Sequence, residues 1–276
     1  MMSLPIEDLT DSNLKSVISF VHSATGITIP EHKKTMIQRR LSPRLKFHSL
    51  TSYSDYLKLV KSDSEEMVQF INMVTTNETN FFRTERVWEY FECTFLPSFL
   101  EMNPGKTLKV WSAAASTGEE GYSIGMCCED FKRRQSTSFD YSVLGTDISS
   151  RVIDLATSGR YSGRNIDNIK KKSIDRFNRF FNKVGDQHIV SSILRSKVSF
   201  ATHNLFNTLK SDELFDIVFL RNVLIYFSTE DQKKVIHHLI KKMAPGAILV
   251  VGESESLSNL NTELEFISPL IYRKRV

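Results

Sequence analysis

The feature that most constrains the fold of this chain is an alternation of strand and helix patterns after residue 107. Apolar runs such as "LKVWSA", "FDIVFLRN" and "AILVVGES" have the length and β-branched content of strands, and amphipathic helical segments separate them. Strands that alternate with helices form a parallel sheet covered on both faces. The pattern therefore predicts an α/β domain, to which the tail "EFISPLIYRKRV" adds one or two strands.

Residues 10–75 show helix patterns only. The segment "DSNLKSVISFVHSATG" repeats apolar residues at helical spacing, with Asp11 or Ser12 as a candidate cap and Gly26 as a stop. Three further amphipathic segments follow, and Ser64 is the candidate cap of the last one. We expect a small helical bundle.

These patterns divide the 276 residues into three parts. We expect an all-α domain over residues 1–76, a linker with a lead-in helix over residues 77–106, and the α/β domain over residues 107–276. Short alternating stretches around Gly185 interrupt the strand–helix alternation, and they predict a small antiparallel β insert at about residues 175–203.

Composition excludes some classes of protein. There is no run of about 18 apolar residues that would span a membrane, and the N-terminal residues lack the pattern of a signal peptide, so we expect a cytoplasmic protein. The three cysteines fit neither a zinc motif nor a disulfide framework, and we expect no metal. A net charge of +4 suits an acidic partner of any kind without requiring nucleic acid.

The candidate binding residues lie where the predicted strands end. In an open parallel sheet, ligands bind outside the carboxyl ends of the strands, near the point where the strand order reverses. A carboxylate there can accept hydrogen bonds from both hydroxyls of a ribose, and small residues let the backbone approach a ligand closely. The strand-end residues are Ala113 to Glu120, Asp147, Asn204, Leu205, Arg221 and Asn222, with Tyr226 soon after.

Two acids indicate the charge of the ligand. Glu119 and Glu120 follow Gly118 in the turn that binds pyrophosphate in dinucleotide enzymes, where they would repel a phosphate. They would attract the ammonium and sulfonium groups of S-adenosylmethionine, which also carries a ribose and an adenine. The turn therefore favours S-adenosylmethionine over a dinucleotide.

Several segments resemble those of a known family, the CheR-type chemotaxis receptor methyltransferases. "TTNETNFFR" resembles the family's T-x-N-x-T-x-F-F-R segment, and "VWSAAASTGEEGYSI" resembles its cofactor motif, with Gly121 where the family usually has proline. "GTDIS", "NLF" and "FDIVFLRNVLIYF" follow in the family's order and spacing. The resemblance covers almost the whole chain, including its helical N-terminal part.

The resemblance implies a Rossmann-like class I methyltransferase domain with a small antiparallel β insert, preceded by an all-α domain. It implies an enzyme that moves a methyl group from S-adenosylmethionine to glutamate carboxylates of chemotaxis receptors. The products would be glutamyl methyl esters and S-adenosylhomocysteine, and the reaction would serve adaptation. The family expectation is a monomer that binds the cytoplasmic helices of its receptors.

Residue roles also follow from the resemblance. At the cofactor's methionine end it places Asn77, Thr79 and Arg83, with Glu120 at the amino group and Asp147 at the ribose. Around the adenine and the pocket wall it places Asn204, Leu205, Arg221 and Asn222, with the small Ala113 in the cofactor motif. Arg83 and Tyr226 would lie near the methyl group, where Arg83 would orient the substrate carboxylate and Tyr226 would donate a hydrogen bond. No general base is needed, because a glutamate with a pKa of about 4.3 is already ionised at neutral pH.

The receptor-facing surface is expected on the second helical segment. Its basic residues would attract a glutamate-rich substrate, and they are Lys33, Lys34, Arg39, Arg40, Arg44 and Lys46. Three apolar residues, Ile37, Leu41 and Leu45, form another face of the same helix. Pro43 departs from the unbroken helix of the family, and we expect it to kink or end the helix near Leu41, with Ser42 as a new cap.

The insert bears on a second partner. In some family members it pairs edge to edge with a short peptide from the receptor's C-terminus, which requires a free strand edge. The segment "NKVGDQHIVS" is short and contains Gly185 as its single glycine, which argues against binding of such a peptide here.

Two other functions fit parts of the pattern. A nucleic-acid methyltransferase would share the fold, but enzymes that methylate base amino groups usually have an Asn/Asp-Pro-Pro-aromatic turn where this chain has "LRNVLIYF". A non-catalytic module that binds S-adenosylmethionine would share the pocket, although the presence of all the pocket residues argues against it.

Overall fold

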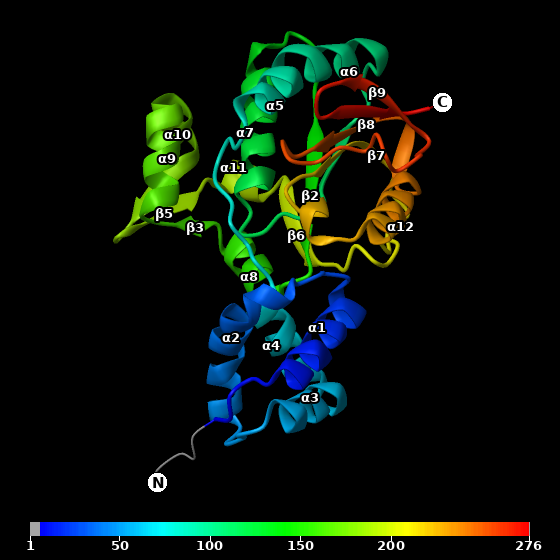
Figure 1. Cartoon of the computed structure of the whole chain (residues 1–276). Coiled ribbons are helices and arrows are strands. Elements are labelled where there is room, and N and C mark those ends of the chain that lie inside the picture. Colours follow the sequence, from blue (N-terminus) through cyan, green and yellow to red (C-terminus); the bar gives the residue numbers. More distant parts are fainter. Residues whose placement is uncertain (1–5, 276) are drawn as a thin grey trace.

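The computed structural model describes residues 6–275, which form a helical domain below an α/β domain (Figure 1). The helical domain contains α1 (Asp11–Thr25), the short 3₁₀ turn η1 (Glu31–Lys33), α2 (Lys34–Phe47), α3 (Tyr53–Ser62) and α4 (Ser64–Val74). The prediction of helices alone over residues 10–75 is confirmed. Their apolar faces enclose a core of their own that includes Val17, Leu41, Tyr56 and Phe70.

Two of the predicted helix caps are wrong by one residue. Thr10, not Asp11 or Ser12, caps α1 by accepting a hydrogen bond from Asn13 N–H at 3.2 Å. Asp63 rather than Ser64 caps α4, because Asp63 has an extended backbone and its Oδ1 accepts from both Glu65 N–H and Glu66 N–H, whereas Ser64 is already the first residue of the helix. Gly26 does end α1, as expected, at a φ of 73°.

The expectation that Pro43 breaks the second helical segment is wrong. Helix α2 continues past Pro43 to Phe47. Leu41 and Leu45, one on each side of the proline, are fully buried, so packing holds the backbone helical through this point. Pro43 itself is exposed, where water can satisfy the carbonyl that its missing N–H leaves unpaired.

The α/β domain is built on one mixed sheet of seven strands in the order β6-β2-β1-β7-β8-β10-β9. Five strands are parallel, and β10 is antiparallel to both of its neighbours. The strands are β1 (Leu108–Ser112), β2 (Tyr141–Asp147), β6 (Val198–Thr202), β7 (Phe215–Leu220), β8 (Met243–Val251), β9 (Leu264–Ser268) and β10 (Ile271–Lys274). The order reverses between β1 and β7, which is where a ligand is expected.

Helices cover the sheet on both faces, with α7 and α12 on opposite sides in Figure 1. The covering helices are α5 (Glu85–Tyr90), the π-helical η2 (Phe91–Phe95), α6 (Leu96–Met102), α7 (Glu119–Arg134), α8 (Ser150–Ser158) and α12 (Thr229–Ile240), and a 3₁₀ turn, η3 (Leu224–Tyr226), follows β7. The predicted fold class, an α/β domain after a small all-α domain, is confirmed.

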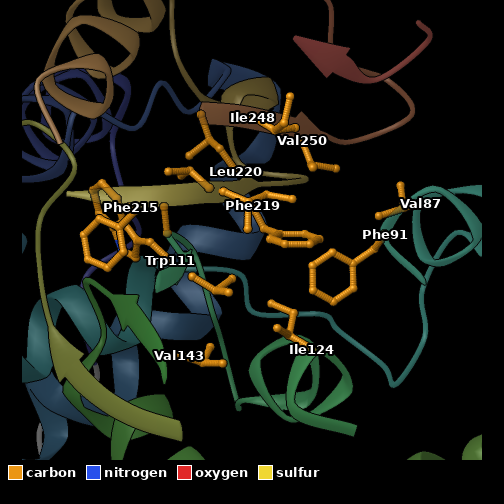
Figure 2. Packing of buried hydrophobic residues seen from close by; sticks show 14 of the residues in the cluster. Val87, Phe91, Trp111, Ile124, Val143, Phe215, Phe219, Leu220, Ile248 and Val250 are labelled. Carbon is orange, nitrogen blue, oxygen red and sulfur yellow. The ribbon is translucent and has the colours of Figure 1, made fainter. Parts of the chain in front are cut away.

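The core between the sheet and the lead-in helices is dense with aromatic rings. Figure 2 shows Phe91 facing Phe219 of β7, and their ring centroids are 5.6 Å apart in an edge-on arrangement. Trp88 stacks on Phe219 as well, at 5.9 Å. All three side chains are almost fully buried. This packing anchors α5 and η2 against the middle of the sheet.

The antiparallel insert is confirmed, but its bounds differ from the expected 175–203. Its sheet has the order β3-β5-β4, formed by β3 (Arg160–Tyr161), β4 (Phe181–Val184) and β5 (Gln187–Val190). Three helices accompany it, α9 (Arg164–Lys172), α10 (Ile174–Phe180) and α11 (Ser192–Arg195). Residues 198–202 form β6 instead, because their backbone pairs with β2 along the edge of the main sheet, where Val198 is buried.

The two domains are joined by contacts far apart in sequence. Adding a Cβ atom to Gly26 would bring it within 1.9 Å of the Phe206 ring, so the end of α1 lies directly against the loop after β6. Four hydrogen bonds cross the same boundary. Two involve α1 and its end, His22 Nε2 with Asp231 Oδ2 at 2.8 Å and Asn204 Nδ2 with Ala24 O at 3.1 Å. The other two are Thr28 N with Tyr226 O at 2.8 Å and Ser149 Oγ with Asn72 Oδ1 at 2.7 Å.

Within residues 6–275, none of the helices combines the length and the apolar character needed to cross a membrane.

Candidate functional site

A cavity of about 580 Å³ lies where the helical domain, the linker and the sheet meet. Its walls come from the loops that follow β1, β2, β6 and β7, from residues 74–83, and from the end of α1 and the start of α2. The volume falls within the range of small-molecule sites. All ten predicted cofactor-binding residues line it, and so does Tyr226. Their contact with a cofactor stays a prediction.

The turn after β1 separates the two acids. Gly118 adopts a φ of 94°, a conformation that favours glycine, and α7 starts at the next residue. Glu119 points away from the cavity, where Thr117 Oγ1 and Asn165 Nδ2 donate hydrogen bonds to it at 2.6 and 2.5 Å. The expectation that both acids face the ligand is therefore wrong for Glu119, because consecutive residues on a helix point about 100° apart.

Glu120 faces the cavity and is held by two partners. Ser112 Oγ donates to its Oε1 at 2.7 Å, and Arg221 Nη1 pairs with its Oε2 at 2.9 Å. Both charged residues are buried. Arg221 Nη2 also donates to the carbonyl of Arg83 at 2.8 Å. The pair thus connects β7, α7 and the linker, and it places a carboxylate edge in the cavity wall.

Asp147, at the end of β2, is held by backbone groups. Ser116 N–H and Ser149 N–H each donate to its carboxylate at 3.0 Å. Burial raises the pKa of Asp147, against the lowering effect of these backbone donors. A carboxylate has about four acceptor positions. Asp147 therefore retains acceptor capacity for the hydroxyls of a ribose.

In the loop after β6, the side-chain amide of Asn204 forms hydrogen bonds within the protein. Asn204 Oδ1 accepts from Phe206 N–H at 3.0 Å, while its Nδ2 donates to Ala24 O in the helical domain. The side chain of Asn204 thus fixes the loop and the domain boundary, and its backbone carbonyl accepts from Asn207 N–H at 2.9 Å. Leu205 contributes an apolar surface beside it.

The linker enters the site in a strained conformation. Phe82 and Thr84 have φ values of 52° and 67°, in the left-handed region that costs non-glycine residues energy. Ser123 Oγ accepts from Phe82 N–H at 3.1 Å, and Lys172 Nζ donates to Phe82 O at 2.7 Å. These contacts hold Arg83 at the cavity wall, where its Nη1 donates to Glu78 O at 3.1 Å.

The basic residues expected to face a receptor separate into two groups. Arg40 and Arg44 are used within the chain: Arg40 Nη1 donates to the carbonyls of Val74 and Thr75, and Arg44 pairs with the buried Glu66. Lys34 pairs with Asp11 on the surface.

The other three, Lys33, Arg39 and Lys46, are exposed and have no ion pair or side-chain hydrogen bond in the part of the chain that the structure describes. Lys33 also lines the cavity.

The cavity contains charges of both signs. Four basic side chains, Lys33, Arg40, Arg83 and Arg221, and three acidic ones, Glu78, Glu120 and Asp147, line it, a net of +1. Of the two acids predicted to attract a cation, Glu120 lines the cavity and Glu119 does not. Acidic side chains therefore do not dominate the electrostatic potential of the cavity. The mixture suits a ligand that carries a cation and a carboxylate together.

Sequence comparison identifies the family. A family model described as "CheR methyltransferase, SAM binding domain" matches residues 77–272, and one described as "CheR methyltransferase, all-alpha domain" matches residues 12–75. The chain belongs to the CheR methyltransferase family. Its activity is therefore that of a methyltransferase that uses S-adenosylmethionine.

Relatives from several bacteria support the assignment over nearly the whole length. The chain is 31% identical to the chemotaxis protein methyltransferase Cher2 of Pseudomonas putida, over 93% of this chain and 95% of that protein. It is 33% identical to chemotaxis protein methyltransferase 1 of Vibrio cholerae, with 94% of each covered. It is 31% identical to the chemotaxis protein methyltransferase of Escherichia coli, over 96% and 91%.

The cavity of this CheR-family chain fits S-adenosylmethionine. Two buried side-chain nitrogens, Arg221 Nε and His203 Nε2, have no hydrogen-bond partner in the described residues, and both residues line the cavity. Burial lowers the pKa of His203, so its imidazole is neutral at pH 7. They are unsatisfied polar groups of residues in the cavity wall. No cluster of His, Cys, Asp or Glu within residues 6–275 could hold a metal ion.

Sequence reasoning missed several residues of the site. His203 follows β6 directly and could have been found by the same strand-end logic that selected Asn204. Trp88 and Met36 line the wall through tertiary packing, for which the sequence carries no local signal. Glu255 lies outside the cavity but holds one of its loops, and nothing in "GESES" distinguishes it from its neighbour Glu253.

Proposed function

We propose that this enzyme transfers the methyl group of S-adenosylmethionine to glutamate side chains of chemotaxis receptors and forms glutamyl methyl esters. The observation that carries the proposal is the cavity itself, which Asp147 at the end of β2, Glu120 in the first turn of α7, Arg83 of the linker and Tyr226 after β7 all line. The chemotaxis relatives support the choice of receptor.

The cofactor would lie along the carboxyl ends of the strands. Asp147 would accept the ribose hydroxyls, Glu120 would face the ammonium group, and Leu205 would pack on the adenine beside the backbone of Asn204. Asn77, Thr79 and Arg83 would surround the methionine end, against Ala113. When bound, S-adenosylmethionine supplies the electrophilic methyl group.

The chain's own residues would then orient the acceptor. A receptor glutamate is ionised at neutral pH, so positioning rather than proton removal is the enzyme's task, and positioning can supply several kcal/mol of the barrier. The guanidinium of Arg83 has one hydrogen bond within the described residues, to Glu78 O, which leaves most of its N–H groups for a carboxylate. Tyr226, which lines the same cavity, would donate a hydrogen bond to that carboxylate.

Receptor binding would involve the helical domain, residues 1–76, of which residues 1–5 lie outside the described part. Lys33, Arg39 and Lys46 keep their charges available on its surface, while the linker over residues 77–106 and the domain over residues 107–276 would hold the cofactor. The attraction is long-range and weakens with added salt. The short insert gives no reason to propose a receptor tail peptide there.

A transfer assay with methyl-labelled cofactor and receptor cytoplasmic fragments tests the proposal. We expect label on receptor that mild base releases as methanol, and we expect Arg83→Ala to lower turnover at least tenfold. Label on RNA or DNA would instead favour a nucleic-acid methyltransferase. Binding of S-adenosylhomocysteine without any transfer would indicate a non-catalytic module. Unchanged turnover and cofactor affinity in Arg83→Ala would remove Arg83 from the mechanism.

A further inference from the structure

Glu255, in the turn after β8, accepts four backbone hydrogen bonds with one carboxylate. Its Oε2 accepts from Gly252 N–H at 2.6 Å and Asn222 N–H at 2.9 Å, and its Oε1 accepts from Val223 N–H at 2.8 Å and Leu224 N–H at 2.7 Å. The side chain is buried. A buried carboxylate with four N–H donors is fully satisfied, so its contacts specify one position for the backbone that surrounds it.

The backbone that Glu255 holds belongs to the wall of the cofactor cavity. Arg221, Asn222, Val223 and Tyr226 all line that cavity, while Glu255 does not. Three consecutive N–H groups of this loop converge on the carboxylate, which is the arrangement of an anion-binding nest. In most nests the anion is a ligand, whereas here the chain supplies it from the turn after a neighbouring strand.

The loop of residues 221–224 needs a partner that holds its backbone in place. Asn222 has a φ of 58°, a left-handed conformation that persists only where the surroundings impose it. The rest of the loop is held independently, because Gln232 Nε2 donates to the carbonyls of Leu224 and Phe227, and Thr28 N–H donates to the carbonyl of Tyr226. Loss of Glu255 would therefore displace residues 221–223 without unfolding the loop.

We propose that Glu255 is a positioning residue of the methyltransferase, which acts on the cofactor through the loop of residues 221–224 rather than by contact. Through Arg221, the same loop sets the orientation of Glu120, with which Arg221 pairs at 2.9 Å. For methyl transfer the inference rests on the proposed function, but for cofactor binding it requires only the S-adenosylmethionine site.

Two variants disturb the contact in different ways. Glu255→Gln replaces one acceptor oxygen with a donor, which opposes two of the four N–H groups. Gly252→Ala keeps Glu255 but places a Cβ atom 2.6 Å from its Oε2 and 2.8 Å from Asn222 N. For both variants we expect a Kd for S-adenosylhomocysteine at least tenfold higher by calorimetry, and a kcat at least tenfold lower with a smaller change in the receptor KM.

Asp216→Asn is the matched control. Asp216 is also a buried carboxylate, but it lies at the opposite end of β7, where it accepts from Lys106 Nζ and Lys109 N–H. It does not line the cavity. We expect this variant to lower the melting temperature while the Kd for S-adenosylhomocysteine stays within twofold of the wild type. Glu255→Asp, which keeps the charge, should restore part of the affinity lost in Glu255→Gln.

The outcomes separate cleanly. If Glu255→Gln and Gly252→Ala fold, as judged by circular dichroism, and bind S-adenosylhomocysteine with wild-type Kd, Glu255 is merely structural and the inference is overturned. The inference also fails if Asp216→Asn weakens binding as much as they do. If binding changes as expected but no receptor ester forms in the wild type, the positioning role stands and the proposed substrate fails.

Discussion

At the scale of single residues, the site depends on charges that are buried and paired rather than exposed. Glu120 and Arg221 neutralise one another inside the protein, and Asp147 is held by backbone N–H groups. Removing one partner of such an arrangement leaves the other without compensation, which costs more than the pair itself contributes. Substitutions at these positions should therefore have large effects on cofactor affinity.

Asp147→Asn should raise the Kd for S-adenosylhomocysteine at least tenfold, a loss of about 1.4 kcal/mol. The amide cannot accept from Ser116 and Ser149 and still offer a carboxylate to the ribose. Because burial raises the pKa of Asp147, wild-type affinity should fall as pH drops and the ionised form is lost, beginning above the usual range of an aspartate. Calorimetry between pH 8 and pH 5 measures both effects, and equal affinities across that range would contradict the ionised form as the binder.

Glu66→Gln should destabilise the helical domain by about 3 kcal/mol at pH 7. Burial opposes ionisation of Glu66, but hydrogen bonds from Arg44, Tyr56 and His48 outweigh it and lower its pKa from 4.5 to about 2. The stabilisation is therefore complete above pH 4.5 and is lost as pH falls toward 2.

Urea unfolding at pH 7 and pH 3 tests this prediction, and the difference between variant and wild type should shrink at pH 3. Glu65→Gln is the control, because Glu65 is an exposed residue of the same helical turn, and it should cost less than about 1 kcal/mol. A difference that does not change with pH would rule out ionisation of Glu66 as its source.

At the scale of elements, local rules failed where tertiary contacts decided. A proline inside a helix normally costs about 3 kcal/mol, yet the buried Leu41 and Leu45 keep α2 continuous through Pro43. Residues 198–202 alternate as an insert strand would, but they pair with β2 because that edge of the sheet was open. Neither the continuous helix nor the pairing of residues 198–202 with β2 can be predicted from the ten or so residues around it.

Pro43→Ala should stabilise the protein by about 2 kcal/mol. Alanine restores an N–H donor for the carbonyl of Arg39, and the gain of about 3 kcal/mol is reduced by up to about 1 kcal/mol for the more flexible unfolded chain. Thermal unfolding should show a melting temperature several degrees higher. A lower melting temperature would mean that the proline ring contributes packing that its exposure does not reveal.

At the scale of the whole molecule, the two domains are interlocked around the cavity. The topology of parallel strands could be predicted from the sequence, and with it the convergence of Asp147, Asn204 and Arg221, because strand ends meet at one edge whatever the side chains are. The partners of Arg40 and Arg44 could not, since they lie on α4 and its C-terminal end, 22 or more residues away in the chain. Contacts that follow from the path of the backbone could be predicted, whereas side-chain partners that depend on how the helices pack could not.

Gly26→Ala should be far more destabilising than Gly105→Ala, although the two glycines have nearly the same φ, 73° and 77°. An alanine at Gly105 meets no atom within 4 Å and should cost about 1–2 kcal/mol for its backbone alone. At Gly26 it would also strike the Phe206 ring. Denaturant unfolding measures the loss of stability in each variant, and the Kd for S-adenosylhomocysteine measures the loss of cofactor affinity. Equal losses in the two variants would show that the Phe206 ring can move aside at the domain boundary.

The contacts at this boundary bear on retargeting. If the helical domain selects the receptor, as proposed, exchanging it for that of a relative would be the way to direct a chimera to another receptor. The chain would then be joined after Val74, where α4 ends. The exchange also removes Ala24, Gly26 and Thr28, which support the loops after β6 and β7. A graft that lacks these contacts would misalign the loops that line the cavity, so the transplanted domain must present equivalent partners to Asn204, Phe206 and the backbone carbonyl of Tyr226.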